Sequence, residues 1–216
     1  MRFKEIKRIL GLCSFEDDLL SIGYRMIAGI DEVGRGSLAG PLVAATVILD
    51  QKKVLIEGIN DSKKISEKKR DHLYGVIINS CICWAVSEVE PAEIDKYNIT
   101  RANIMAFERA LANLKIKPDI ILADHVNVKG GSSRTPGNYP AECLSIIKGD
   151  EQSVSIAAAS IIAKVTRDRI MRKMSALYPE YGFERNKGYG TRSHLLSLQK
   201  YGPTFIHRVS FKGVLN

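Results

Sequence analysis

The chain has 216 residues, of which 45% are apolar, and this length and composition fit one globular domain with a sizeable core. No run approaches the roughly 18 consecutive apolar positions of a membrane-spanning helix, and residues 1–20 lack the apolar core and cleavage site of a secretory signal. We therefore expect a cytoplasmic protein. We also expect it to be a monomer. Its four cysteines, Cys13, Cys81, Cys83 and Cys143, are expected to be reduced, buried and unreactive, because their spacing is neither that of a disulfide scaffold nor that of paired metal ligands.

The net charge of +8 is concentrated at the carboxyl-terminal end of the chain. Residues 160–216 contain 11 Lys and Arg against 3 acidic residues, whereas residues 1–159 contain 21 of each sign and cancel. A basic segment on a neutral body is typical of a surface that contacts a polyanion such as nucleic acid. Tyrosines interleaved with these charges could add stacking partners: Tyr178, Tyr181, Tyr189 and Tyr201. The alternative is a solvated basic face that only keeps the protein soluble.

The first half of the chain alternates strand-like and helix-like patterns. Residues 1–25 are expected to form a short helical lead-in without recognisable chemistry. Strands are predicted at 26–31, 41–49 and 81–89, with a helix that starts near Ser66 between the second and the third. Apolar spacing predicts a helix at 99–114. After Pro118, a short strand is predicted at 119–123.

The second half contains the longest predicted helix. Residues 129–140, rich in Gly, Ser and Pro, are predicted to form a loop, and residues 143–147 a brief strand. Residues 154–177 form a long helix whose first half is apolar nearly all round and is therefore expected to be buried. This order of strands and helices indicates an α/β or α+β layered domain. We place that domain at residues 26–216, with the basic carboxyl-terminal region included in it.

Four acidic residues stand where predicted strands stop. Asp31 and Glu32 follow MIAGI, Asp124 follows DIILA, and Asp150 follows SIIKG. In open α/β sheets, sites gather at strand ends, so these carboxylates can converge on one cleft. Because successive strand residues point to opposite faces, Asp31 and Glu32 can share a site only if the strand ends or kinks between them. Gly34 and Gly36 would supply the flexibility for that kink.

The chemistry of this acidic set favours a divalent metal. Clustered carboxylates repel one another and need a cation to remain ionised. Ligands that are all oxygen atoms suit Mg²⁺ or Mn²⁺ far better than Zn²⁺. From spacing alone, however, a metal site and a set of ordinary turn acids and helix caps are about equally supported.

The glycine-rich stretch GIDEVGRGSLAGP at 29–41 is neither a GxGxxG nor a Walker A sequence, so it gives no support for a nucleotide cofactor. Gly34, Arg35 and Gly36 instead place a guanidinium between two residues that let a ligand approach the backbone closely. That arrangement suits recognition of a phosphate or a sugar. The alternative is a strained turn with a solvated arginine.

Six motifs, in this order, resemble the bacterial ribonuclease HII family. They are GIDEVGRGSLAGP (29–41), NDSKKIS (60–66), LADH (122–125), KGDEQSVSIAAASIIAKVTRDRIM (148–171), NKGYGT (186–191) and HRVSF (207–211). The resemblance covers residues 28–211, nearly the whole chain. It implies an α/β, ribonuclease H-like fold, with a central mixed sheet flanked by helices and a small helical carboxyl-terminal region.

The resemblance also implies an activity. The expected enzyme is a metal-dependent endoribonuclease that hydrolyses the RNA strand of RNA:DNA hybrids and incises duplex DNA 5′ of single embedded ribonucleotides. Two Mg²⁺ or Mn²⁺ ions are expected in the catalytic state, and the products are expected to carry 3′-hydroxyl and 5′-phosphate ends. The substrates are the partners that the resemblance implies, and no membrane is among them.

Carried over residue by residue, the resemblance assigns the site. The acidic, metal-binding set falls on Asp31, Glu32, Asp124 and Asp150. The substrate contacts fall on Gly34, Arg35, Gly36 and Tyr189, with Lys63 and Lys64, and Lys164 as a further candidate, facing phosphates. His125 stands where family members often have Gly; it could orient Asp124 or be an exposed loop residue. Asp168 has Lys164 or Arg172 within one helical turn and is left out of the site.

Two alternative functional interpretations explain less of the sequence. A DNA-only nuclease or junction resolvase on the same fold would share the acids but would not need the glycine-arginine-glycine turn or Tyr189. A binding module without activity would need the basic segment but not the acids, whose charges would repel phosphates.

Overall fold

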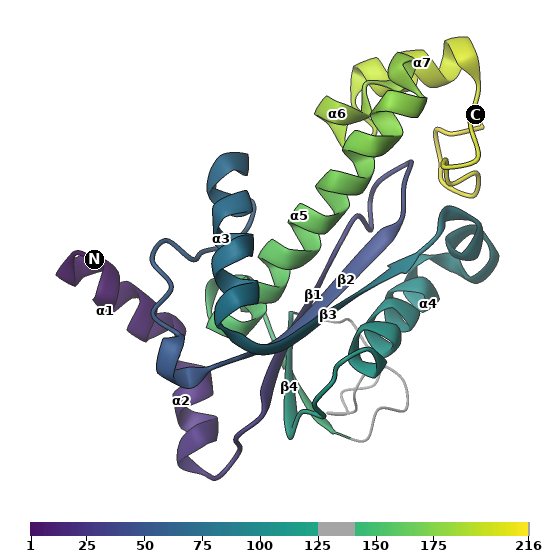
Figure 1. Ribbon diagram of the computed structural model, residues 1–216. Helices are drawn as coiled ribbons and strands as arrows, with labels where there is room; N and C mark the ends of the chain where they lie inside the picture. Colours follow the sequence, from purple (N-terminus) through teal and green to yellow (C-terminus); the bar gives the residue numbers. More distant parts are fainter. Residues whose placement is uncertain (125–140, 216) are drawn as a thin grey trace.

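A five-stranded mixed sheet lies at the centre of the computed structural model, which describes residues 1–124 and 141–215 (Figure 1). The strands are β1 (Ile27–Val33), β2 (Leu42–Leu49), β3 (Cys81–Val89), β4 (Ile120–Asp124) and β5 (Glu142–Ile146). Their order is β3-β2-β1-β4-β5; β2 pairs antiparallel with β1 and β3, whereas β4 pairs parallel with β1 and β5. The predicted α/β class with a mixed sheet is confirmed.

Helices cover both faces of this sheet (Figure 1). On one face, α5 (Val154–Leu177) crosses β1 and β2 together with α3 (Glu67–Ser80); on the other face lies α4 (Pro91–Ala112). The approach of α5 is so close that a Cβ at Gly29 would overlap the backbone of Ser155. Residues 154–163 are all buried, which confirms the prediction for the first half of this helix. None of the described helices is long and apolar enough to cross a membrane.

The amino-terminal segment forms two helices, α1 (Phe3–Leu12) and α2 (Ser14–Ser21). The carboxylate of Glu16 in α2 is fully buried, and it accepts hydrogen bonds from the Ser153 hydroxyl and from the Ser155 amide at 3.0 Å. Both donors belong to the beginning of α5, where unpaired amides favour a carboxylate. The segment therefore fixes the start of α5, four residues after Asp150.

Two predicted features differ from the structure. α4 begins at Pro91 rather than at residue 99, because a capping box between Glu90 and Glu93 starts it; Asn98, with φ 65°, then interrupts the helical backbone. The expected break after Asp31 is also wrong, since β1 continues to Val33 with unbroken pairing to β2. The helix start at Ser66 is confirmed, because its side chain caps the Lys69 amide. The predicted loop at 129–140 lies outside the described residues.

The carboxyl-terminal region is small and helical, as predicted. It contains α6 (Phe183–Asn186) and α7 (Arg192–Tyr201), which lie at the far end of α5 in Figure 1. Short 3-10 turns lie at Gln51–Lys53, Gly149–Glu151 and Pro179–Tyr181. The carboxyl-terminal region has its own apolar cluster, which includes Tyr181, Phe183, Leu198 and Ile206. This cluster holds the region as a packed unit against the end of α5.

The cysteines are free thiols in largely apolar surroundings. Cys13, Cys83 and Cys143 are buried, but Cys81 is half-buried, so the prediction of burial is wrong for that residue. Burial raises the pKa of Cys13 to about 12 and the pKa of Cys81 and Cys143 to about 11. These three thiols therefore stay protonated and unreactive near neutral pH.

Candidate active site

Asp31 and Glu32 are neighbours near the end of β1, and the extended backbone directs their side chains to different helices. Asp31 is 8% exposed, and the nearby Ser160 side chain of α5 partly offsets the effect of burial on its pKa. Oε1 of Glu32 lies 3.5 Å from Nη1 of Arg35, and the side chains of Arg35 and of Asn103 in α4 lower the pKa of Glu32. Burial and then the charge of Glu32 raise the pKa of Asp31 well above its ordinary value, and burial raises the pKa of Glu32. The two carboxylates therefore repel each other although they have different partners.

The other two predicted acids come to the same edge of the sheet. Asp124 is the last residue of β4, which pairs parallel with β1. Its Oδ1 accepts a hydrogen bond of 2.8 Å from the Gly149 amide, and this bond places the next residue, Asp150, beside it. The charge of Asp124 contributes to the raised pKa of Asp31, Glu32 and Asp150. The other three acids thus all lie within electrostatic reach of Asp124.

The carboxylates of this acidic cluster are directed toward neighbouring groups of the protein. Among the described residues, no three carboxylate, imidazole or thiol groups are close enough to hold one metal ion. The Asp31 carboxylate accepts a hydrogen bond from the Glu32 amide, and the Asp124 carboxylate accepts one from the Gly149 amide. The residues nevertheless fit a hard divalent cation, because the donors are all oxygen, burial disfavours their charge, and a cation would relieve their repulsion. The individual ligands remain a prediction.

The segment at 60–66 brings two lysines to the cluster. Nζ of Lys63 lies 3.6 Å from Oδ2 of Asp150, and Nζ of Lys64 lies 2.9 Å from Oε1 of Glu151. Asp61 shapes this turn, because its Oδ1 accepts from the Lys63 amide at 2.9 Å. Asp61 is also buried, and after burial itself it is the largest cause of the raised pKa of Asp150. Asp61 is thus a fifth acid near the cluster, and it is not among the predicted site residues. The available sequence signal is that Asp favours turns, which could have located the turn but not its proximity to Asp150.

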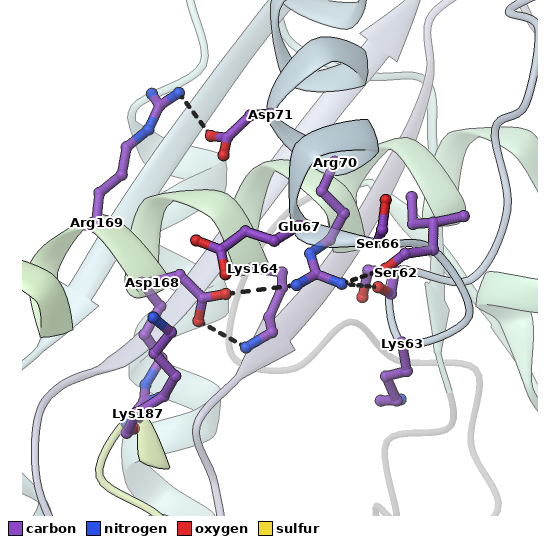
Figure 2. A network of polar contacts seen from close by, with 12 residues as sticks. Ser62, Lys63, Ser66, Glu67, Arg70, Asp71, Lys164, Asp168, Arg169 and Lys187 are labelled. Carbon is purple, nitrogen blue, oxygen red and sulfur yellow. Dashed lines mark hydrogen bonds and ion pairs between the residues drawn. The ribbon is translucent and has the colours of Figure 1, made fainter. Parts of the chain in front are cut away.

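A network behind this segment holds it against α5 (Figure 2). Nη1 of Arg70 donates to the carbonyl oxygen of Ser62 at 2.7 Å, and its Nη2 lies 3.8 Å from Oδ2 of Asp168. Asp168, 2% exposed, also accepts from Nζ of Lys164 at 2.6 Å. Lys164, a candidate phosphate contact from the sequence, therefore has an ion pair within its own helix. Asp168 serves this network, in agreement with its exclusion from the acidic site.

The glycine turn (residues 34–36) contains two glycines with different surroundings. Gly34 has φ +97°, and a Cβ there would overlap the side chain of Arg167. At Gly36 the backbone is not in the left-handed region, and nothing lies within 4 Å of an added Cβ. Gly34 is therefore required by the packing of the protein itself. Gly36 leaves open space of the kind a ligand could use.

The tyrosine loop (residues 187–190) packs directly against the segment that follows the glycine turn. The Gly188 carbonyl accepts from the amides of Leu38 at 2.8 Å and Ala39 at 3.2 Å. Tyr189 is 38% exposed, and the guanidinium carbon of Arg167 lies 5.5 Å from the centroid of its ring. The structure thus brings Tyr189 close to the glycine turn, although more than 150 positions separate them in the sequence.

The basic carboxyl-terminal segment is only partly a surface. Arg167 and Arg208 are fully buried, whereas Arg185 and Arg192 are exposed. Tyr181 belongs to the apolar cluster of this region and is buried, so it is not a stacking partner for a ligand. The interpretation of the whole +8 as an exposed patch is therefore wrong for the two buried arginines.

Comparison with known proteins places this architecture in a family. The family model described as Ribonuclease HII matches residues 28–214. A ribonuclease HII from Acetivibrio thermocellus is 50% identical over 96% of this chain and 78% of its own length, and one from Caldicellulosiruptor bescii is 48% identical over 93% and 94%. The crystal structure of ribonuclease H2 from Pyrococcus horikoshii superposes with a TM-score of 0.76 at 29% identity, covering 88% of this chain and 95% of that one. The predicted ribonuclease H-like fold is confirmed, and the chain belongs to the ribonuclease HII family of metal-dependent endoribonucleases.

Proposed function

We propose that this enzyme hydrolyses the RNA strand of RNA:DNA hybrids and incises duplex DNA on the 5′ side of single embedded ribonucleotides. The observation that carries the proposal is the meeting of three features at one edge of the sheet. These are the acidic cluster, the open face of Gly36 and the half-exposed ring of Tyr189. The first fits phosphodiester hydrolysis, and the other two fit recognition of a sugar.

Asp31, Glu32, Asp124 and Asp150 are the residues that would hold two Mg²⁺ or Mn²⁺ ions. Such ions supply charge neutralisation at the phosphodiester and activation of a water molecule, which leads to 3′-hydroxyl and 5′-phosphate ends. The chain itself contributes placement. Lys63, 3.6 Å from Asp150, is positioned to contact a phosphate oxygen of the bound strand.

Discrimination between RNA and DNA requires a contact with the 2′-hydroxyl group, which is the sole difference between the two sugars. A backbone group beside Gly36 can reach that hydroxyl, because no side chain fills the space above this residue. The ring of Tyr189 would stack on the deoxyribose of the following nucleotide. A site that hydrogen-bonds a hydroxyl rejects substrates without it, since its own polar groups are then left unpaired.

The test is a gel assay on three labelled duplexes: DNA with one ribonucleotide, an RNA:DNA hybrid and all-DNA. Each is incubated with Mg²⁺, with Mn²⁺ and with chelator. We expect cleavage of the first two with either metal, a single cut 5′ of the lone ribonucleotide, and no cleavage of all-DNA. Asp50→Asn, which changes a carboxylate outside the cluster, should cut like the parent, whereas Asp31→Asn should not. Cleavage of all-DNA, or full activity in chelator, would overturn the proposal.

A further inference from the structure

Arg167 of α5 is a fully buried arginine whose hydrogen bonds go to backbone carbonyl groups. Its Nε donates to Pro41 at 3.0 Å, its Nη2 to Ala39 at 3.0 Å, and its Nη1 to Lys187 at 2.8 Å. The guanidinium group has its donors in a planar, rigid fork, so these three bonds fix three carbonyl oxygens relative to one another.

The three carbonyls belong to two segments that are far apart in the sequence. Ala39 and Pro41 follow the glycine turn, whereas Lys187 begins the tyrosine loop. The same guanidinium lies under the ring of Tyr189, at 5.5 Å from the centroid. It also occupies the space that a side chain at Gly34 would need. A single side chain therefore touches both halves of the sugar-recognition site.

Arg167 does not use an acid to offset its buried charge. In the described part of the chain, the adjacent Asp168 forms its ion pairs with Lys164 and Arg70 instead (Figure 2). Burial of a charged group without a counter-ion is unfavourable unless its hydrogen bonds are well formed. An apolar side chain of similar length would leave the carbonyl oxygens of Ala39, Pro41 and Lys187 without this donor. The charge and the fork point to a role in holding the two segments.

We propose that Arg167 is a positioning residue for ribonucleotide recognition, which sets the spacing between the glycine turn and Tyr189 so that they act on two successive sugars. This inference rests on the proposed function. At a lone ribonucleotide, the enzyme must recognise a ribose and the deoxyribose next to it at once. In an RNA:DNA hybrid, the same register recurs at every step, so a small change in spacing matters less there.

The experiment compares Arg167→Lys and Arg167→Met with the parent. The matched control is Arg169→Met, because Arg169 lies on the same helix but is exposed, with an ion pair to Asp71. The values of kcat/KM are measured on the single-ribonucleotide duplex and on the RNA:DNA hybrid, each in the Tyr189 and the Tyr189→Ala background. Circular dichroism and melting temperature establish that each variant folds.

We expect both Arg167 variants to lose roughly 10- to 100-fold on the single-ribonucleotide duplex and several-fold less on the hybrid. In the Tyr189→Ala background, the additional loss should shrink to within about 3-fold, because the two residues act as a unit. Equal losses on both substrates and in both backgrounds would overturn the inference, as would parental behaviour of Arg167→Lys. If Arg167→Met does not fold, Arg167→Lys carries the test. Failure of the parent to cut the single-ribonucleotide duplex would overturn the proposed function instead.

Discussion

The substitution Gly36→Ala distinguishes a residue that folding requires from a residue that substrate binding requires. The backbone of Gly36 is not in the left-handed region, and an added Cβ has no protein atom within 4 Å. Gly36→Ala should therefore fold normally. Loss of conformational freedom in the unfolded chain should even raise the free energy of unfolding by about 0.4–1 kcal/mol.

The expected effect on activity is large by comparison. A methyl group in the space beside the bound sugar would displace the 2′-hydroxyl from its backbone partner. Loss of such a hydrogen bond in a desolvated site costs about 1–3 kcal/mol, which corresponds to a fall in kcat/KM of roughly 5- to 150-fold. Gly36→Ala should thus be a stable protein with low activity.

Gly34→Ala should instead lower the stability of the protein, and it should lower activity as well, because the added Cβ displaces Arg167. With φ +97° and Arg167 against its Cα, an alanine there is strained by about 1–3 kcal/mol, which lowers the melting temperature by roughly 2–12 °C. Gly75→Ala is the matched control, because it adds the same methyl group in open space on α3, away from the acidic cluster. The assay is kcat/KM on the single-ribonucleotide duplex together with thermal unfolding. Parental activity of Gly36→Ala would refute the assignment of this face to the substrate.

Four further outcomes are expected from the same structure. Asp31→Asn should lower kcat by roughly 1000-fold or more; calorimetry should show an unchanged or higher melting temperature, because burial already disfavours charge on this carboxyl. Tyr189→Ala should lose much of the cleavage rate on the single-ribonucleotide duplex in a gel assay, and Tyr189→Phe less, since stacking needs only the ring. Duplex binding should weaken steeply with salt, and Arg192→Gln should reduce the slope of log K against log salt by about 0.9 for each phosphate that the variant no longer neutralises; an unchanged slope would place this exposed residue outside the interface. Burial and then His194 lower the pKa of His207 from 6.5 to about 4, so the unfolded chain binds more protons between these values and stability is lost as the pH falls through this range. Between these two pH values, the free energy of unfolding of His207→Gln, measured by denaturant titration, should fall less steeply than that of the parent, by up to about 1.4 kcal/mol per pH unit. Parallel curves of unfolding free energy against pH would contradict this.

The fold could be predicted where local patterns and tertiary packing agree. The apolar run of β2 and the mostly apolar start of α5 are buried on every side, so their sequences carry the signal directly. The beginning of α4 could not be predicted from apolar spacing, because Asn98 interrupts the helix and breaks that spacing. The continuation of β1 through Glu32 depends on pairing with β2, which is a long-range interaction that no local pattern encodes.

The four acids and the two glycines could be selected from residue type and position, but their separate roles could not. The difference between Gly34 and Gly36 depends on where Arg167 lies, and that residue comes more than 130 positions later in the chain. Arg167 and Arg208 count as surface charge in the sequence, since nothing in their neighbours predicts burial. Asp61 is similar: its turn is visible locally, but its proximity to Asp150 is a product of the fold.

A pair of buried histidines shows that Tyr189 is held from a second side. The Thr204 amide donates to Nδ1 of His207 at 2.9 Å, so that nitrogen carries no proton and Nε2 must carry it. This Nε2–H then donates to Nε2 of His194 at 3.1 Å, which leaves Nδ1–H of His194 to donate to the Tyr189 carbonyl at 2.9 Å. One tautomer of each ring satisfies all of these hydrogen bonds. A proton added to His194 would place two hydrogens between the facing Nε2 atoms, and a proton added to His207 would face the Thr204 amide hydrogen. The backbone of Tyr189 is thus fixed by neutral rings while its side chain is supported by Arg167, and rigid support of this kind is what a site needs to discriminate a single hydroxyl group.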